Sequence, residues 1–348
     1  MKLIPSHRSA LRIWRSVRLG RFPLPTPLPP KAIPSLDRLI SSNASLRAIA
    51  EAQAPRAQGH GALDVLLETG RDNSLSQAQP FDVLVTDRES RHPARSIRHH
   101  LATLPLPPES LCLLFPGVYL PTPECLLLQL AEELSEWELL AVAYELCGSY
   151  VIDPRLEYGF MPDVDPVSSQ GKLRGYCQGA RGRRNIRKVR AVCSMLHDGS
   201  ASPRESDLAT ALSYPLDQGG FWMGSFQMNV RESFAGFRGY LAGGNDLYPD
   251  ILFDARPLVV EYDSRAFHGT NDKADRDKDR ADGLRAAGYE VVTFTNLQFS
   301  SLDKFVQGMA RVGSYMGVDV LGPGMDPEIE RARCRLLTWM RNPHHQPL

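Results

Sequence analysis

Residues 250–263 read DILFDARPLVVEYD, which is two short apolar runs joined by a polar turn at 254–257. Runs of four to eight β-forming residues on either side of a turn that contains proline are typical of a β-hairpin. The sequence therefore predicts strands at about 250–253 and 258–262. The rest of the fold is read outward from this hairpin.

The predicted hairpin gathers three carboxylates on one face. Counting residues outward from the midpoint of the turn places Asp250 opposite Glu261. Directly opposed residues have Cβ atoms ~5 Å apart. Asp263 lies on the same face, because side chains alternate along a strand. Opposed like charges destabilise a sheet, and a hard divalent cation such as Mg²⁺ would compensate them. The alternative is an edge hairpin whose solvated acids pair with Arg256 or Arg265.

The elements around the hairpin follow a regular order. Residues 202–205 read SPRE, with a capping serine, a proline at the first helical position and a glutamate three residues on, so a helix is expected to about Leu212. The other expected elements are a weak strand at 227–232, a helix at 272–287, a strand at 289–295, and helices at 302–312 and 327–341. The strand–helix–strand crossover predicts a parallel strand pair.

Short motifs here occur in the order found in a known superfamily. They are YPD at 248–250, EYDS at 261–264, His268, D-x-x-R-x-x-x-L at 277–284 and GYEV at 288–291. The series resembles the PD-(D/E)XK nuclease superfamily, in the branch related to very-short-patch-repair endonucleases, over about Ser202–Phe305. The resemblance implies a restriction-endonuclease-like domain, with a mixed sheet flanked by helices, that hydrolyses phosphodiester bonds in DNA with Mg²⁺ or Mn²⁺. Phage defence and DNA repair are the implied settings.

The resemblance also implies roles for individual residues. It implies Glu205, Asp250 and Glu261 as metal ligands, and the hairpin geometry adds Asp263; the last three acids are also expected to act in catalysis. Gln298 matches a glutamine at the start of the helix that follows the last strand. Asp263 departs from the family, which has a lysine there to orient water and stabilise developing charge.

Three residues downstream of the hairpin are the candidates to replace the missing lysine. They are His268, Lys273 and Lys278. His268 is a candidate general base, because an unperturbed histidine titrates near neutral pH. Arg280 is expected to face the site or to contact nucleic acid. The alternative for this charged stretch is a solvated helix face.

Basic residues concentrate between Gly171 and Arg190, where there is no acid. We expect the run to contact nucleic-acid phosphates, through Arg181, Arg183, Arg184, Arg187 and Lys188. A solvated face or linker is the alternative. The whole chain has a formal net charge of zero, so total charge neither supports nor opposes a DNA partner.

The preceding region loosely resembles AbiEi-type antitoxin and regulator proteins. The matching pieces are Arg91–His100, the GVY motif at 117–119, PTPE at 121–124 before an apolar helix, and ELCG at 145–148. This resemblance implies an alternative function: a non-catalytic, DNA-binding transcriptional regulator with a degenerate nuclease fold. It also implies a partner protein, if the gene belongs to a toxin–antitoxin or defence locus.

The 348 residues, 43% of them hydrophobic, are enough for two domains of mixed α and β structure (α/β or α+β). We expect a disordered, basic, proline-rich arm at 1–36, a smaller mixed α/β domain at 37–150, a connector with a basic helix at 151–198, the nuclease-like domain at 199–318, and a C-terminal helix and tail at 319–348. Six dispersed cysteines without a C-x-x-C pair favour a reducing compartment. Without a signal peptide or membrane helix, a cytoplasmic protein is expected.

Overall fold

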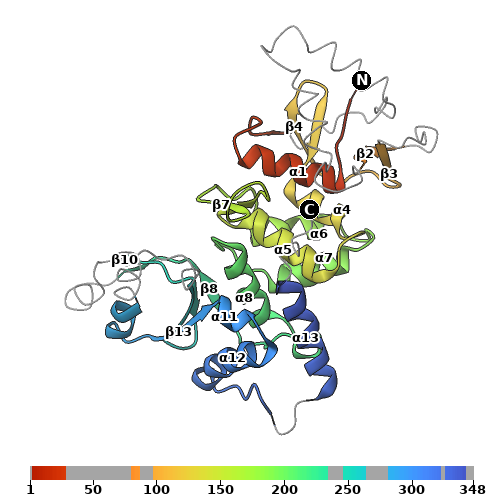
Figure 1. Cartoon of the computed structure of the whole chain (residues 1–348). Helices are drawn as coiled ribbons and strands as arrows, with labels where there is room; N and C mark the ends of the chain where they lie inside the picture. Colours follow the sequence, from red (N-terminus) through yellow and green to blue (C-terminus); the bar gives the residue numbers. More distant parts are fainter. Residues whose placement is uncertain are drawn as a thin grey trace. The chain divides into compact units, whose positions relative to one another are not determined.

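The computed structural model describes residues 2–28, 80–86, 97–233, 246–263, 281–322 and 326–341 (Figure 1). These residues form a mixed α and β structure that divides into two compact units. The N-terminal unit comprises residues 1–139 and 151–193, and the C-terminal unit comprises 140–150 and 194–347. None of the helices in these ranges is both long and apolar enough to cross a membrane.

A four-stranded mixed sheet forms the centre of the C-terminal unit. Its strand order is β13 (Glu290–Thr295), β12 (Leu258–Asp263), β11 (Ile251–Phe253) and β8 (Phe226–Met228). β12 and β13 run parallel, whereas the other neighbours are antiparallel. The hairpin and the parallel pair predicted from the sequence are therefore confirmed.

The hairpin also has its predicted register. Ile251 pairs with Val260 and Leu252 pairs with Val259, so continuing the ladder by one residue places Asp250 opposite Glu261. The turn is held to β8 by Asp254, whose carboxylate accepts hydrogen bonds from Ser225 and Gln227.

Both faces of the hairpin are covered by apolar side chains. Leu252 and Val259 form a buried cluster with Leu284, which lies in the helical residues 281–286. On the opposite face Ile251 and Val260 are buried too. By strand alternation the acids share a face with Leu252 and Val259, so they lie at the end of a sheet that is buried on both sides.

The remaining elements of the C-terminal unit follow the predicted order, with small additions. The helices are α8 (Pro203–Ser213), the 3-10 turn η2 (Leu216–Gln218), α11 (Asn296–Phe299), α12 (Leu302–Met316) and α13 (Pro327–Arg341). β9 (Glu232–Ser233) and β10 (Asp246–Leu247) form a separate two-stranded ribbon that the sequence did not predict. Only 281–286 of the helix expected at 272–287 falls within the described residues, and it is helical.

Small sheets and short helices make up the N-terminal unit. The strands are β1 (Thr26–Pro27), β2 (Phe81–Val85), β3 (Ile97–Leu101), β4 (Leu111–Phe115), β5 (Val118–Pro121) and β7 (Phe160–Pro162), which pairs with β6 (Tyr150–Ile152). The helices are α1 (His7–Arg18), α4 (Pro123–Leu130), α6 (Gln170–Gly179) and α7 (Ile186–Met195). The unit boundary falls within α5 (Glu136–Cys147).

Two expectations about domain organisation need correction. Residues 1–36 were expected to be a disordered arm, with a short helix at 9–19 as an alternative; within residues 2–28 the alternative holds, because α1 is a helix with nine buried residues, among them Leu11, Ile13 and Trp14. Residues 151–198 were expected to be a connector with one helix. They carry both α6 and α7, and residues 151–193 belong to the compact N-terminal unit. In each case buried apolar residues at helical spacing prevail over the local basic charge.

Candidate functional site

Glu205 lies in the first turn of α8, where the local sequence fixes it. Ser202 caps the helix by accepting a hydrogen bond from the backbone N–H of Glu205, and proline occupies the first turn. The Glu205 side chain is 7% exposed. Its Oε2 accepts hydrogen bonds from the backbone N–H of Ala201 at 2.9 Å and from Nδ2 of Asn229 at 2.6 Å. The carboxylate is therefore buried in a fixed orientation.

The second acid of the site is Asp250, the residue just before β11. Its Oδ2 accepts a hydrogen bond from the backbone N–H of Tyr262 at 2.7 Å. The side chain therefore bends toward the backbone of β12 and joins the two strands where their ladder ends. This contact fixes Asp250 beside the part of β12 that carries Glu261.

Glu205 and Asp250 interact electrostatically. Burial and the negative charge of Asp250 raise the pKa of Glu205 to about 7, although hydrogen bonds from Ala201, Ser202 and Asn229 oppose the shift. Two carboxylates held together in a buried place favour the uptake of a positive charge. The raised pKa makes Glu205 a candidate to share a proton or a cation with Asp250.

Asn229 connects the two acids, and no sequence motif had pointed to it. Its backbone N–H donates to the carbonyl oxygens of Pro249 and Asp250. Its side-chain Nδ2 donates to Glu205 and to the carbonyl of Gly199. The residue has a φ of 48°, a left-handed conformation that asparagine adopts more readily than most residues. The only sequence signal was an asparagine at the end of a strand.

Glu261 and Asp263 occupy alternate positions at the end of β12 and are half-buried. In the parallel ladder they lie beside Thr293 and Thr295 of β13. Glu205, Asp250, Glu261 and Asp263 are the four acids predicted as ligands. Among the described residues, no three of them bring ligand atoms to within 4.8 Å of one another. The acids thus provide a coupled pair, Glu205 and Asp250, with Glu261 opposite Asp250, rather than a closed cage of four carboxylates.

The other predicted site residues differ in outcome. Gln298 caps α11, because its Oε1 accepts hydrogen bonds from the backbone N–H and the hydroxyl of Thr295. It therefore fixes the helix that follows β13, at the strand end where Asp263 pairs with Thr295. His268, Lys273, Lys278 and Arg280 lie outside the described residues.

The basic run of the N-terminal unit divides into two groups. Three of the predicted phosphate-binding residues hold protein groups: Arg183 bonds the carbonyl of Pro105, Arg184 pairs with Glu132, and Lys188 bonds the carbonyls of Ala131 and Leu134. The contacts of Arg184 and Lys188 attach the start of α7 to the segment just after α4, and that of Arg183 reaches the segment between β3 and β4.

Arg181 and Arg187 form the second group. Both are exposed, and within the described ranges neither forms a hydrogen bond or an ion pair. They line one surface depression together with other residues of the run, among them Arg190. Of the five residues predicted to contact phosphates, Arg181 and Arg187 are thus the two whose guanidinium groups are not bonded to other described residues.

Comparisons with models of known protein families, with curated proteins and with solved structures found no match to this chain. Its function is therefore inferred from the arrangement of its own residues.

Proposed function

We propose that the C-terminal unit is a Mg²⁺-dependent endonuclease that hydrolyses phosphodiester bonds in DNA, with Mn²⁺ as an alternative ion. One observation carries the proposal: buried Glu205 of α8 meets Asp250 at the end of the mixed sheet, where Glu261 lies opposite Asp250. The element order gives further support. A helix, three strands, a helical segment and a parallel strand follow one another, as a restriction-endonuclease-like domain requires.

The two coupled acids suit magnesium. Mg²⁺ binds through one or two protein carboxylates and completes its shell with waters and substrate phosphate oxygens. Glu205 and Asp250 would hold the ion, and Glu261, opposite Asp250, would reach it through a coordinated water. When bound, such an ion polarises the phosphoryl oxygen and lowers the pKa of a coordinated water. Asn229 and the backbone of Ala201 and Tyr262 keep the two carboxylates oriented before substrate arrives.

A second candidate is a non-catalytic DNA-binding regulator. One observation favours it: Asp263 lies where the resembled nucleases have a lysine, so that position of β12 offers a negative charge in place of a positive one. An aspartate there binds a cation or accepts a proton, but it does not stabilise the charge that develops on the phosphate. DNA binding without cleavage is the behaviour expected of this candidate.

Asp250→Asn is the first test of the site. The purified full chain is incubated with supercoiled plasmid and Mg²⁺ or Mn²⁺, and nicking is followed on a gel. We expect metal-dependent nicking by the native protein and at least a hundredfold slower nicking by Asp250→Asn, because the substitution removes a charged ligand while it preserves the shape.

Asp254→Asn is the matched control, since Asp254 lies at the turn of the same hairpin and bonds Ser225 and Gln227. It should nick at nearly the native rate. No nicking by the native chain would exclude the catalytic proposal and leave the regulator. Equal nicking by Asp250→Asn would place catalysis elsewhere.

The two unengaged arginines lead to a prediction about DNA binding. Arg181→Ala with Arg187→Ala should weaken binding to duplex DNA and lower the slope of log K against log salt concentration by about 2, since each phosphate contact contributes ~0.9. Arg184→Ala, which removes a residue paired with Glu132, should leave the slope unchanged. Fluorescence anisotropy over a range of salt concentrations measures both. Equal slopes for all three proteins would assign the basic run a purely structural role.

A further inference from the structure

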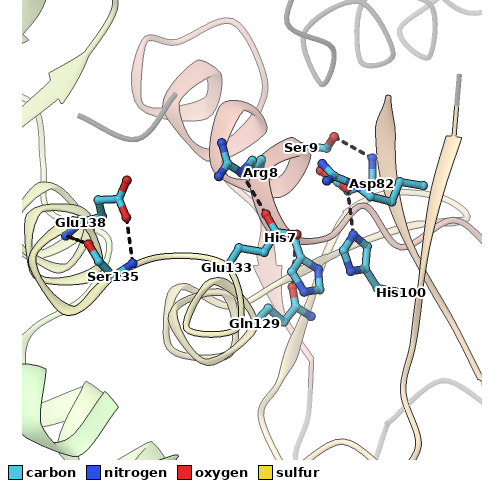
Figure 2. Close-up of polar contacts among 10 residues, drawn as sticks. His7, Arg8, Ser9, Asp82, His100, Gln129, Glu133, Ser135 and Glu138 are labelled. Atoms are coloured by element: carbon cyan, nitrogen blue, oxygen red, sulfur yellow. Dashed lines mark hydrogen bonds and ion pairs between the residues drawn. The ribbon is translucent and has the colours of Figure 1, made fainter. Parts of the chain in front are cut away.

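A second cluster of possible metal ligands lies entirely within the N-terminal unit. His7, His100 and Glu133 each bring one ligand atom to within 4.8 Å of the other two. Figure 2 shows that they come from the start of α1, from β3 and from the segment after α4. The cluster shares no residue with the acidic site of the C-terminal unit.

His7 occupies an energetically unfavourable position. It is 4% exposed, and its Nδ1 has no hydrogen-bond partner among the described residues. A buried polar atom without a partner destabilises the folded state. Its φ of 46° is in the left-handed region, which is uncommon for residues other than glycine, although histidine adopts it more readily than most. The backbone N–H is held by Oε1 of Gln129 at 3.1 Å, and a ligand for Nδ1 would offset the cost of burying this nitrogen.

His100 is oriented by a buried carboxylate. Its Nε2 lies 2.8 Å from Oδ1 of Asp82, a fully buried residue that also accepts a hydrogen bond from Nε of Arg98 at 2.6 Å. When a histidine donates one ring N–H to a carboxylate, the other ring nitrogen keeps its lone pair and becomes a better metal ligand. The His100 ring stacks on that of His7, with centroids 3.5 Å apart, so the two rings would turn out of this stack to direct a nitrogen of each at one ion.

Glu133 completes the cluster with a negative charge. One of its oxygens, Oε2, pairs with Nε of Arg8 at 2.9 Å, and the side chain is 19% exposed. One oxygen of this carboxylate lies within 4.8 Å of a ring nitrogen of each histidine. The donor set is thus two imidazole nitrogens and one carboxylate oxygen.

We propose that His7, His100 and Glu133 bind a divalent ion of the zinc class. Two histidines and one glutamate are a known ligand set for such ions, whereas Mg²⁺ and Ca²⁺ prefer oxygen ligands alone. Three protein ligands leave one position for water or a substrate atom. Asp82 is the positioning residue, which holds His100 in the ligating tautomer.

The ion would also connect distant parts of the chain. The three ligands lie on separate segments, so the ion would attach α1 to β3 and to the end of α4. A ligand that binds only the folded state stabilises it in proportion to its concentration. The melting temperature should therefore rise with Zn²⁺ and fall when a chelator removes it.

Metal titration of the full chain tests the proposal. After treatment with a chelator and dialysis, Zn²⁺ binding is followed by calorimetry and Co²⁺ binding by its visible absorption. We expect His100→Gln to bind one equivalent less than the native protein, or to bind that equivalent at least tenfold more weakly. Glutamine keeps a donor toward Asp82 but lacks the ligating nitrogen. His99→Gln, the neighbouring change on β3, should titrate like the native protein.

Two more variants keep the result decisive. His7→Asn should lose the same equivalent, and asparagine tolerates the left-handed backbone at this position, so this variant carries the test if His100→Gln does not fold. Asp250→Asn should retain the equivalent, which separates this site from the proposed magnesium site. If the native protein binds no Zn²⁺ at micromolar concentrations, or if both histidine variants titrate like it, the cluster is only a stacked pair of rings in an ion-pair network.

Discussion

Trp14→Ala is expected to destabilise the N-terminal unit by about 3–5 kcal/mol, the usual cost of truncating a buried tryptophan. Trp14 is 5% exposed, and its Nε1 donates a hydrogen bond to the carbonyl of Pro121 at 2.9 Å. The helix that carries it packs on β2 and α4. The substitution would therefore leave both a cavity and an unbonded carbonyl. For a unit of this size the loss corresponds to a fall in melting temperature of roughly 6–20 °C, measurable by circular dichroism.

Leu24→Ala is the control for this prediction. Leu24 belongs to the same N-terminal segment but is 76% exposed, so its truncation should change stability by less than about 0.5 kcal/mol. If Trp14→Ala melts with the native protein, residues 2–28 do not belong to the folded core, and the expectation of a loose arm would stand.

The N-terminal segment shows how charge hides a core helix in the sequence. Five arginines and a run of prolines surround the apolar residues of 1–36, and this composition predicts disorder although Leu11, Trp14 and their neighbours have helical spacing. Long basic side chains lie along apolar surfaces with their charged ends in contact with partners. Arg8 and Arg21, for example, pair with Glu133 and Asp153. Charge alone was a poor guide to disorder.

The hairpin could be predicted because its determinants are local. A four-residue turn fixes the register, and strand alternation then fixes the face of every side chain. The electrostatic coupling of Glu205 to Asp250 could be predicted only from the resemblance to the nuclease superfamily. The role of Asn229 could not be predicted from the sequence, because it depends on a left-handed backbone and on a tertiary contact between the end of β8 and α8. The cluster of His7, His100 and Glu133 was missed for the same reason, since its members come from three separate segments.

The basic run shows the opposite error, because composition predicted more phosphate-binding residues than the structure leaves available. Its composition predicted phosphate binding for five residues, but the carbonyl of Pro105 engages Arg183, and a glutamate and two carbonyls just after α4 engage Arg184 and Lys188. Helix ends leave carbonyl groups without helical partners, and basic side chains commonly satisfy them. Whether a basic residue meets protein or solvent depends on the tertiary contacts of α7, which the local sequence does not encode.

Glu205→Gln is expected to stabilise the metal-free protein at pH 8. The pKa of Glu205 is about 7 in the folded protein, above its usual value of 4.5. A carboxyl group whose pKa is raised by folding stabilises the folded state while it is protonated. The contribution is fully present below pH 4.5 and is lost as the pH rises through 7. At about 1.4 kcal/mol per pKa unit, the native protein loses roughly 3 kcal/mol over that range.

Glutamine does not ionise, and its carbonyl oxygen still accepts the hydrogen bonds from Ala201 and Asn229. In the presence of a chelator, urea unfolding should therefore show the variant about as stable as the native protein at pH 4.5 and up to about 3 kcal/mol more stable at pH 8. Glu290→Gln, which changes an exposed glutamate of the same unit, should leave the pH dependence unchanged.

Mg²⁺ should stabilise the native protein at pH 8 and have less effect on Glu205→Gln, which should also nick plasmid more slowly. A variant that is more stable but less active is the expected behaviour of a residue kept for its function at a cost in stability. If Glu205→Gln is less stable than the native protein at pH 8, Glu205 serves mainly as the N-terminal anchor of α8, and the metal-binding role proposed for it is wrong.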